Sequence, residues 1–241
     1  MAAGGQKAQH QPPSAQRAAS LGRSMDEDEP ERSRPLHVLV DNRFTNKTVL
    51  KNLPERTVLI GRLRKDAKLF HPPPCAQEPR GKGRKLQYWP PAPTPEQIRQ
   101  DDSIPWQAAP VHAAGMVHNM RVKTVSPLRW RANGPRDARL IVIAPLGYRL
   151  RKGSKLLYRQ PACLIVTAPS VPLAQAVQEY VWSWGIEVNF RDQKQLVGVG
   201  QAQVRHPASV ETVPALAVAA CAFLLLAGLR LGSACLLPRP K

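Results

Sequence analysis

The pattern of apolar positions predicts ordered structure from Leu36 onward. Residues 36–40 form a short apolar run that Asp41 follows directly, and residues 57–63 form a second apolar run. Between them, residues 46–53 have weak helical character, and Pro54 ends that segment because proline cannot continue a helix. A strand, a short helix and a strand in this order predict a βαβ unit with two parallel strands.

A second group of short strands is predicted further along the chain. Strand-like segments of a basic stretch, separated by turn residues, lie at 121–125, 138–143, 154–159 and 162–167. Short strands at this spacing favour an antiparallel meander. The segment between the two groups, residues 71–119, is rich in proline and contains a glycine- and lysine-rich stretch at 81–85, so we expect a loop there.

Helical periodicity appears near the C-terminal end of the sequence. Ser170 is suited to an N-cap and Pro172 to the first turn of a helix. The apolar residues that follow recur at helical spacing and predict one buried stripe, formed by Leu173, Val177, Val181, Trp184 and Val188. We expect Trp182 and Trp184 to pack in the interior. A last segment, 213–229, is almost continuously apolar.

These patterns divide the chain into five parts. Residues 1–34 have no apolar periodicity and are predicted to be a disordered leader, and they contain no apolar stretch of the signal-peptide type. The βαβ unit occupies 35–70, the Pro-rich loop 71–119, the strands of the meander 120–168, and the C-terminal helices 169–232.

The charge distribution of the sequence indicates a negatively charged binding partner. The 241 residues carry 35 Lys and Arg against 17 Asp and Glu, a formal net charge of +18. Eleven of the basic residues lie between Arg121 and Arg159, where Asp137 is the single acidic residue. The segment is either a solvated basic face or a surface that follows a DNA backbone. Its candidate DNA contacts are Arg121, Lys123, Arg129, Arg131, Arg149, Arg151, Lys152 and Lys155.

The cysteines exclude two classes of small protein. Cys75, Cys163, Cys221 and Cys235 stand far apart and form no C-x-x-C pair. A disulfide scaffold and a zinc finger both need closely spaced cysteines, so neither fits this sequence.

Polar residues of the predicted C-terminal helix gather on one side of it. At ~100° per residue, Tyr180, Ser183, Glu187 and Lys194 fall within an arc of about 60°, beside the apolar stripe. An amphipathic boundary of this kind is common on surface helices. The same face presents a carboxylate, an ammonium and two hydroxyls at the edge of the buried side.

The spacing of these four residues resembles the signature helix of the DDE transposases of bacterial insertion sequences, which carries Tyr, Arg, Glu and Lys. The surrounding Trp184, Ile186, Phe190 and the run 196–198 also resemble that helix. Residues 38–44 are similar to the strand that holds the second Asp of the family's catalytic triad. Residues 94–97 and 101–106 resemble a loop of some of these enzymes, and the whole resemblance spans about 36–230.

The resemblance implies an α/β fold with a ribonuclease H-like core and a β-rich insertion that lies against DNA. It implies that Asp41 and Glu187 are catalytic residues and ligands of Mg²⁺ or Mn²⁺. Carboxylate oxygens are the ligands that such hard cations prefer. It further implies DNA-phosphate contacts, which would come from Tyr180, Ser183, Arg191 and Lys194. The implied partner is double-stranded DNA, with a homodimer on transposon ends as one assembly and a cytoplasmic, nucleoid-associated location.

The sequence departs from the family pattern at two points. Ser183 stands where the family has Arg, so a bidentate phosphate contact is replaced by a hydroxyl. The first Asp of the triad is not identified, since the strands and helix that carry it need ~60 ordered residues before Asp41. We therefore expect an N-terminally incomplete core that resembles the C-terminal part of such a transposase, and its status as an enzyme stays open.

Three hypotheses follow from the sequence. The chain is a DDE-type transposase that binds DNA and, in intact form, cuts and joins it with divalent metal; or it is a catalytically inactive DNA-binding remnant of one. The third hypothesis is a tail-anchored membrane protein that uses 213–229. Those 17 residues fall short of the ~20 that span a bilayer, and Pro214 lies within them, so we expect them to pack against a sheet instead.

Overall fold

A computed structural model describes residues 20, 34–54, 56–74, 87–113, 116–148, 153–201 and 203–230. The chain divides into two compact units, Met1–Val181 and Trp182–Lys241, which are treated separately below. The predicted disordered leader lies outside the described residues, apart from Ser20 and Arg34.

The predicted βαβ unit is present in the first unit. Strand β1 (Leu36–Val40), helix α2 (Lys47–Lys51) and strand β2 (Thr57–Leu63) follow one another, and β1 pairs with β2 in parallel, with Val38 opposite Leu59. The side chain of Asn46 accepts the backbone N–H of Val49, which caps the start of α2. The fold is thus of the α/β class, as the apolar pattern predicts.

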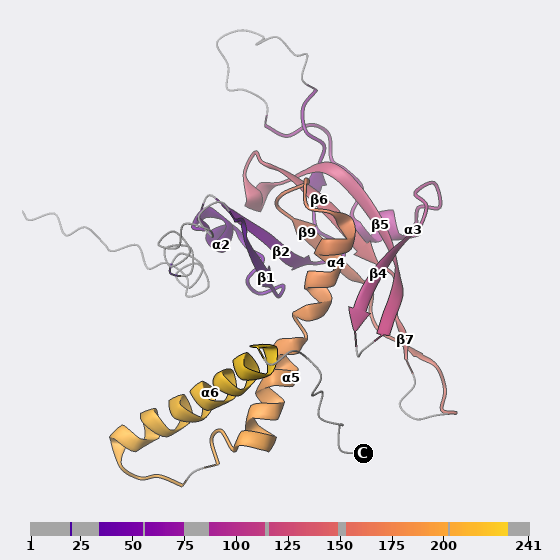
Figure 1. Cartoon of the computed structure of the whole chain (residues 1–241). Helices are drawn as coiled ribbons and strands as arrows, with labels where there is room; N and C mark the ends of the chain where they lie inside the picture. Colours follow the sequence, from indigo (N-terminus) through magenta and orange to yellow (C-terminus); the bar gives the residue numbers. More distant parts are fainter. Residues whose placement is uncertain are drawn as a thin grey trace, which may run out of the picture. The chain divides into compact units, whose positions relative to one another are not determined.

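These two strands belong to a seven-stranded mixed sheet (Figure 1). Its order is β1-β2-β9-β6-β5-β3, and β4 pairs with the other half of β5. The remaining strands are β3 (Leu69–Phe70), β4 (Gln107–Ala113), β5 (Met116–Trp130), β6 (Asp137–Ile143) and β9 (Ala162–Val166). Apart from β1 with β2, every pair in the sheet is antiparallel.

The basic strands do not form a separate β layer. Strand β9 lies between β2 and β6, so the segment predicted as an insertion continues the central sheet instead. Strand β5 shifts register between Val125 and Leu128, where Ser126 and Pro127 interrupt the pairing, since proline has no N–H for the ladder. The strand predicted at 154–159 is shortened to β8 (Leu157–Tyr158), which pairs with β7 (Gly147–Tyr148) in a two-stranded sheet.

The segment 71–119 contains more regular structure than the loop we expected. Its described residues include helix α3 (Pro95–Gln100), strand β4 and the start of β5. The helix begins with a capping box in which Thr94 and Gln97 satisfy each other's backbone N–H groups. Ala109 and Val111 of β4 are buried, whereas Pro110 occupies an edge strand where its missing N–H is tolerated.

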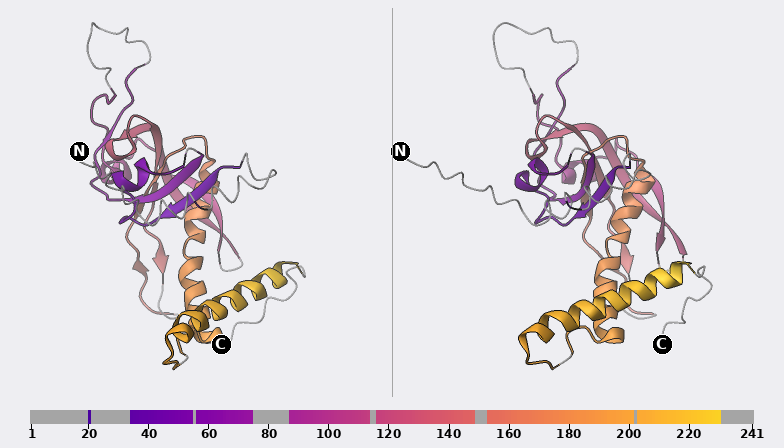
Figure 2. Two further views of the ribbon diagram at one scale, coloured as in Figure 1. Left: turned by 90° about the vertical axis from the view of Figure 1, so that its left-hand side faces the viewer. Right: turned by 60° about the vertical axis from the view of Figure 1, so that its left-hand side comes forward.

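A hydrophobic core covers each face of the sheet. On one face, Ile141 and Leu164 pack beneath Val177 of helix α4 (Leu173–Trp182). On the other face, Leu140 and Ile165 pack beneath α2 and α3. Figure 2 shows α4 and α2 on opposite sides of β1 and β2. Strand β9, and β6 from Leu140 onward, are buried on both faces, which explains why these segments are continuously apolar.

The long C-terminal helix predicted from the sequence is divided. Helix α4 ends at Trp182 and α5 (Gly185–Asp192) begins after a turn, followed by a π-helical turn, η3 (Gln193–Val197). The buried stripe stops with α4. Trp182 and Trp184 are 63% and 55% exposed, so the expectation that they pack in the interior is wrong.

The second unit ends in the long helix α6 (Pro207–Arg230), which contacts η3. It begins before the apolar run identified in the sequence, and Pro214 lies inside it. Its apolar residues are spread around the helix instead of forming one stripe, and Leu216, Phe223 and Leu224 are all exposed.

Candidate functional site

Asp41 directly follows β1 and begins the turn that leads to α2. Its backbone oxygen accepts the N–H groups of Phe44 and Thr45 and the hydroxyl of Thr45. Its side chain is exposed, and no described residue bonds to its carboxylate. The backbone of Asp41 is therefore fixed while its carboxylate stays available to a ligand.

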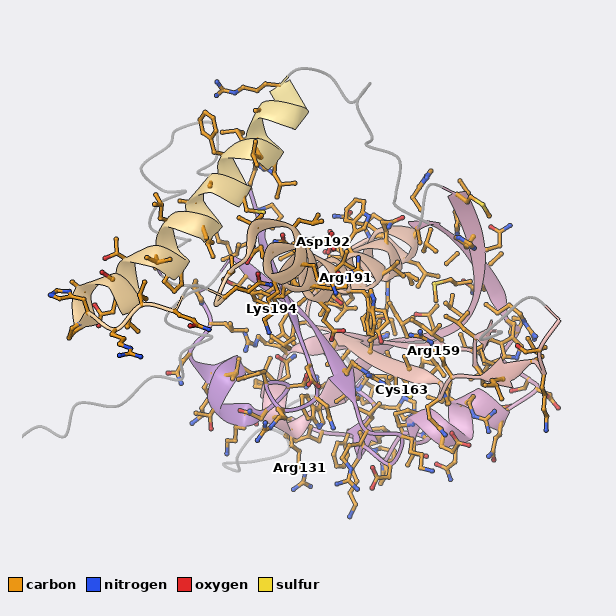
Figure 3. All side chains as sticks on the ribbon, turned by 90° about the horizontal axis from the view of Figure 1, so that it is seen from below. Arg131, Arg159, Cys163, Arg191, Asp192 and Lys194 are labelled. Atoms are coloured by element: carbon orange, nitrogen blue, oxygen red, sulfur yellow. The ribbon has the colours of Figure 1, made fainter. Side chains whose placement is uncertain are left out.

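Glu187 and Lys194 belong to the second unit. Glu187 lies in the first turn of α5 and Lys194 in η3; both side chains are exposed and without a partner among the described residues. Within the same stretch, Arg191 donates from Nε and Nη2 to Oδ1 of Asp192 at 3.0 and 2.9 Å. Figure 3 labels Arg191, Asp192 and Lys194 on this segment. To bind a phosphate, the Arg191 guanidinium must therefore either break its hydrogen bonds to the Asp192 carboxylate or bind both groups at once.

Tyr180 and Ser183 do not share a helix with Glu187. Tyr180 belongs to α4 and packs partly buried against the core beneath that helix, while Ser183 lies in the turn after it and is half-buried. The single polar face predicted from Tyr180 to Lys194 assumed one continuous α-helix. The turn after α4 and the π-helical turn interrupt that helix, so the assumption of one continuous α-helix is wrong.

The donor set can be compared with what a hard cation requires. Asp41 and Glu187 each present a free carboxylate, the ligand type that Mg²⁺ and Mn²⁺ prefer. Within the described part of the chain, no three His, Cys, Asp or Glu side chains gather as metal ligands. Each carboxylate by itself is of a type that fits such an ion, and water and phosphate oxygens would have to occupy the other positions around the ion.

Several members of the predicted basic patch are exposed. Arg121 on β5 lies 5.2 Å from the centre of the Trp106 ring, and Arg131 lies 4.9 Å from that of Phe70. Figure 3 shows the Arg131 side chain reaching away from the ribbon. Lys155 is also exposed. Three further members, Arg149, Arg151 and Lys152, lie outside the described residues.

Lys123 is not part of this surface, which corrects the sequence prediction. Its side chain is 0% exposed, and Nζ donates to the backbone oxygens of Arg99 at 3.1 Å and Asp101 at 2.7 Å. The Trp106 ring lies 4.8 Å from the same nitrogen. Lys123 points to the opposite face of β5 from Val122, and it satisfies the carbonyls where α3 ends. It therefore stabilises the fold and cannot contact DNA.

Arg129 is also largely committed to the protein. Its Nε donates to Oδ1 of Asp137 at 2.8 Å and its Nη1 to the backbone oxygen of Gln87 at 2.5 Å. Because the Arg129 side chain is mostly buried, it contributes little charge to an external surface.

The sequence did not reveal how α4 is held to the sheet. His37 on β1 donates from Nδ1 to the carboxylate of Glu179, 2.7 Å from Oε2, and the two side chains are 14% and 15% exposed. Gln178 accepts the backbone N–H of His112 on β4 and donates to its carbonyl. Neighbouring residues of α4 thus bind strands at opposite edges of the sheet. No local motif marks such pairs, since their members are far apart in sequence.

Comparison with known proteins gives no family assignment: the chain matches no protein-family model and none of the curated proteins.

Proposed function

We propose that this chain is a DDE-type transposase component that binds double-stranded DNA and supplies Asp41 and Glu187 to divalent-metal chemistry on the phosphodiester backbone. The observation that carries the proposal is the exposed Asp41 carboxylate at the carboxyl end of β1, with the exposed cations Arg43 and Lys47 in the segment that follows. A carboxylate accompanied by cations is the combination that phosphoryl transfer uses.

The fold supports the same proposal. The parallel β-α-β unit, with an exposed Asp at the end of its first strand, lies within residues 35–70, which the resemblance assigns to part of a ribonuclease H-like core. We propose that β1, α2 and β2 are that part, and that the strands β5, β6 and β9 correspond to the family's β-rich insertion although they join the main sheet. A homodimer on DNA ends is the assembly that accompanies this proposal.

The chemical roles follow from the side chains. A bound divalent ion supplies activation of the attacking oxygen and stabilisation of the leaving oxygen in an in-line displacement at phosphorus. Asp41 and Glu187 bind cations through their carboxylates, and Lys194 pairs its free ammonium with a backbone phosphate. Tyr180, Ser183 and Arg191 add hydrogen bonds to phosphate oxygens. The exposed Arg121, Arg131 and Lys155 neutralise duplex phosphates and release counterions.

Binding and cleavage are tested separately. Salt-dependent binding of duplex DNA by the full chain supports both the active transposase and the inactive remnant, and its absence refutes both. Cleavage is measured by nicking of supercoiled plasmid in Mg²⁺, comparing the wild type with Glu187→Gln. The matched control is Glu211→Gln, an exposed carboxylate in α6.

The outcomes distinguish the two hypotheses. Nicking that is lost in Glu187→Gln and kept in Glu211→Gln supports a catalytic site. Nicking that is equal in all three proteins, or absent from the wild type, refutes the catalytic hypothesis. The chain is then a DNA-binding protein without catalytic activity.

One observation favours a second candidate, a tail-anchored membrane protein. Residues Pro207–Gly228 form a helical segment of 22 residues with mean hydropathy 2.1 and none of its apolar window buried. The length now reaches the ~20 residues that a bilayer requires, which removes the objection raised by the shorter apolar run. A helix that is apolar all round is either buried in protein or inserted in a membrane.

Carbonate extraction of cells that express the chain separates the two candidates. Release into the supernatant supports the DNA-binding proposal, in which α6 is covered by protein. Retention in the membrane pellet supports the anchored protein, and removing the apolar character of α6 with Leu224→Glu and Leu225→Glu then releases it.

A further inference from the structure

An aromatic side chain lies on the surface beside the candidate catalytic Asp. Phe44 is 46% exposed, although aromatic residues make up only 5% of the chain. It belongs to neither of the two core clusters. The Phe44 side chain therefore faces solvent and does not pack in the core of the sheet.

The segment that carries Phe44 is held in one conformation. The N–H of Phe44 donates to the Asp41 carbonyl, and its own carbonyl accepts the N–H of Asn46. Thr45, the next residue, is buried and bonds to Asp41 through both its N–H and its hydroxyl. Thr45 also lies against Gly61 of β2, where a Cβ would stand 2.5 Å from its Oγ1. Phe44 is thus presented from a fixed backbone, which lowers the entropy cost of binding a ligand.

Two cationic side chains, Arg43 and Lys47, line the same concavity as Phe44. Arg43, Phe44 and Lys47 line an open concavity of about 670 Å³ together with Asn46, Thr48 and Val49. The side chains of Arg43 and Lys47 are exposed and have no bonding partner among the described residues. One concavity therefore offers an aromatic face and two free positive charges.

This combination matches one nucleotide and its phosphates. Base–aromatic stacking is indifferent to base identity, and Arg and Lys bind the flanking phosphates. A base within a duplex is already stacked on its neighbours, so only an unpaired base can reach the ring. An acidic peptide would use the cations but not the exposed ring.

We propose that Arg43, Phe44 and Lys47 form a subsite for an unpaired nucleotide of single-stranded DNA beside Asp41, with the base stacked on Phe44 and the phosphates on the two cations. The inference rests on the proposed function, since it specifies which form of DNA reaches that region. Duplex binding through the exposed Arg121, Arg131 and Lys155 is separate from it.

The test uses the full chain and two probes: a short fluorescein-labelled oligothymidine and a fully paired duplex with blunt ends. We expect Phe44→Ala to weaken binding of the single strand about five-fold or more and to leave duplex binding unchanged. Phe44→Trp keeps an aromatic face and should retain single-strand affinity, whereas Phe44→Leu keeps apolar surface and should lose it. Phe223→Ala is the matched control, because Phe223 is 71% exposed in the other unit.

The cations and the stacking have readouts of their own. Arg43→Gln and Lys47→Gln should each lower the salt slope of single-strand binding by about 0.7. A 2-aminopurine base in the oligonucleotide should be quenched on binding to the wild type and not on binding to Phe44→Leu. Circular dichroism confirms that each variant is folded.

Each result bears on a different claim. If the wild type binds neither probe, the proposed function and the subsite both fail. If it binds the duplex in a salt-dependent way while Phe44→Ala binds the single strand as tightly as the wild type, only the subsite fails. Tighter binding of a single-stranded RNA of the same length overturns the assignment to DNA.

Discussion

Replacing Lys123 separates a structural cation from a DNA-binding cation on the same strand. Lys123 and Arg121 both lie on β5 near the ring of Trp106, but Lys123 is fully buried and Arg121 is exposed. We predict that Lys123→Met destabilises the protein without changing its salt-dependent affinity for DNA, and that Arg121→Ala does the reverse.

The magnitude follows from the contacts of Lys123. Its two charge-assisted hydrogen bonds contribute about 1.5–3 kcal/mol each, and desolvation of the buried ammonium opposes them by several kcal/mol. Lys123→Met keeps the buried stem, removes the bond to the Arg99 carbonyl and leaves the Asp101 carbonyl with the N–H of Ile104, so we expect a net loss of about 1–3 kcal/mol. Lys123→Ala also removes three methylenes worth about 0.8 kcal/mol each, giving a loss of about 3–5 kcal/mol. Arg121→Ala removes only an exposed cation–π contact, worth about 1 kcal/mol at most.

Two measurements check these values. Urea unfolding followed by circular dichroism gives the free energy of unfolding, and fluorescence anisotropy across a salt series gives the slope of duplex binding. The slope should fall by about 0.9 in Arg121→Ala and stay constant in Lys123→Met. A Lys123→Met protein that is as stable as the wild type and has a reduced slope would show that Lys123 is accessible to DNA, which refutes the reasoning from burial.

Further predictions concern Gly61, the buried Cys163 and the helix that covers the sheet. Gly61→Ala places a Cβ 2.5 Å from Oγ1 of Thr45, so we expect a loss of about 1–3 kcal/mol in thermal unfolding, whereas Gly185→Ala meets no neighbour and should be neutral or stabilising; equal effects would contradict the packing of Thr45. Burial raises the pKa of the Cys163 thiol to about 11, so at pH 8 iodoacetamide should modify Cys221 and spare Cys163 until urea is added, as read by peptide mass spectrometry. Because the folded pKa of Cys163 exceeds the unfolded value near 9.0, its contribution is complete below pH 9 and is lost between pH 9 and 11, and Cys163→Ala should flatten that part of the stability profile. Glu179→Ala removes the partner of His37 and should cost about 1–3 kcal/mol, while Glu179→Gln should recover part of it; no loss in either variant would show that the pair does not hold α4 to β1.

The pattern of apolar residues along the chain predicted several strands of the sheet. The apolar runs at 36–40 and 57–63 gave the parallel pair β1–β2, and the runs at 138–143 and 162–167 gave the buried strands β6 and β9. Their order in the sheet was not predictable in this way, because β9 is placed between β2 and β6 by contacts between residues about 100 positions apart.

Two elements were missed although the sequence contains a signal for one of them. Thr94 and Gln97 are spaced as a capping box, which marks the start of α3 within a segment that we expected to be a loop. Strand β4 carries no such signal, since it contains Pro110 and is otherwise rich in alanine. Burial of Lys123 was equally hidden, because its partners are the backbone oxygens that end α3 and not side chains with a recognisable spacing.

The candidate site stays a prediction that rests on residue type, and the sequence did not give its geometry. The positions of Asp41 and Glu187 came from a resemblance, and the structure leaves both carboxylates exposed and without a partner among the described residues. The common face from Tyr180 to Lys194 was an extrapolation of α-helical spacing through a turn and a π-helical segment, either of which changes the angle between successive side chains.

Cleavage of the protein backbone by bound iron tests the central claim, that Asp41 and Glu187 bind divalent metal, most directly. Fe²⁺ replaces Mg²⁺ at oxygen-ligand sites, and with ascorbate and peroxide it generates radicals that cut the chain near its ligands. We predict fragments that end close to Asp41 and close to Glu187, which excess Mg²⁺ suppresses and which are lost at the mutated position in Asp41→Asn and in Glu187→Gln. Fragments that end only elsewhere, or that persist in both variants, would contradict the account.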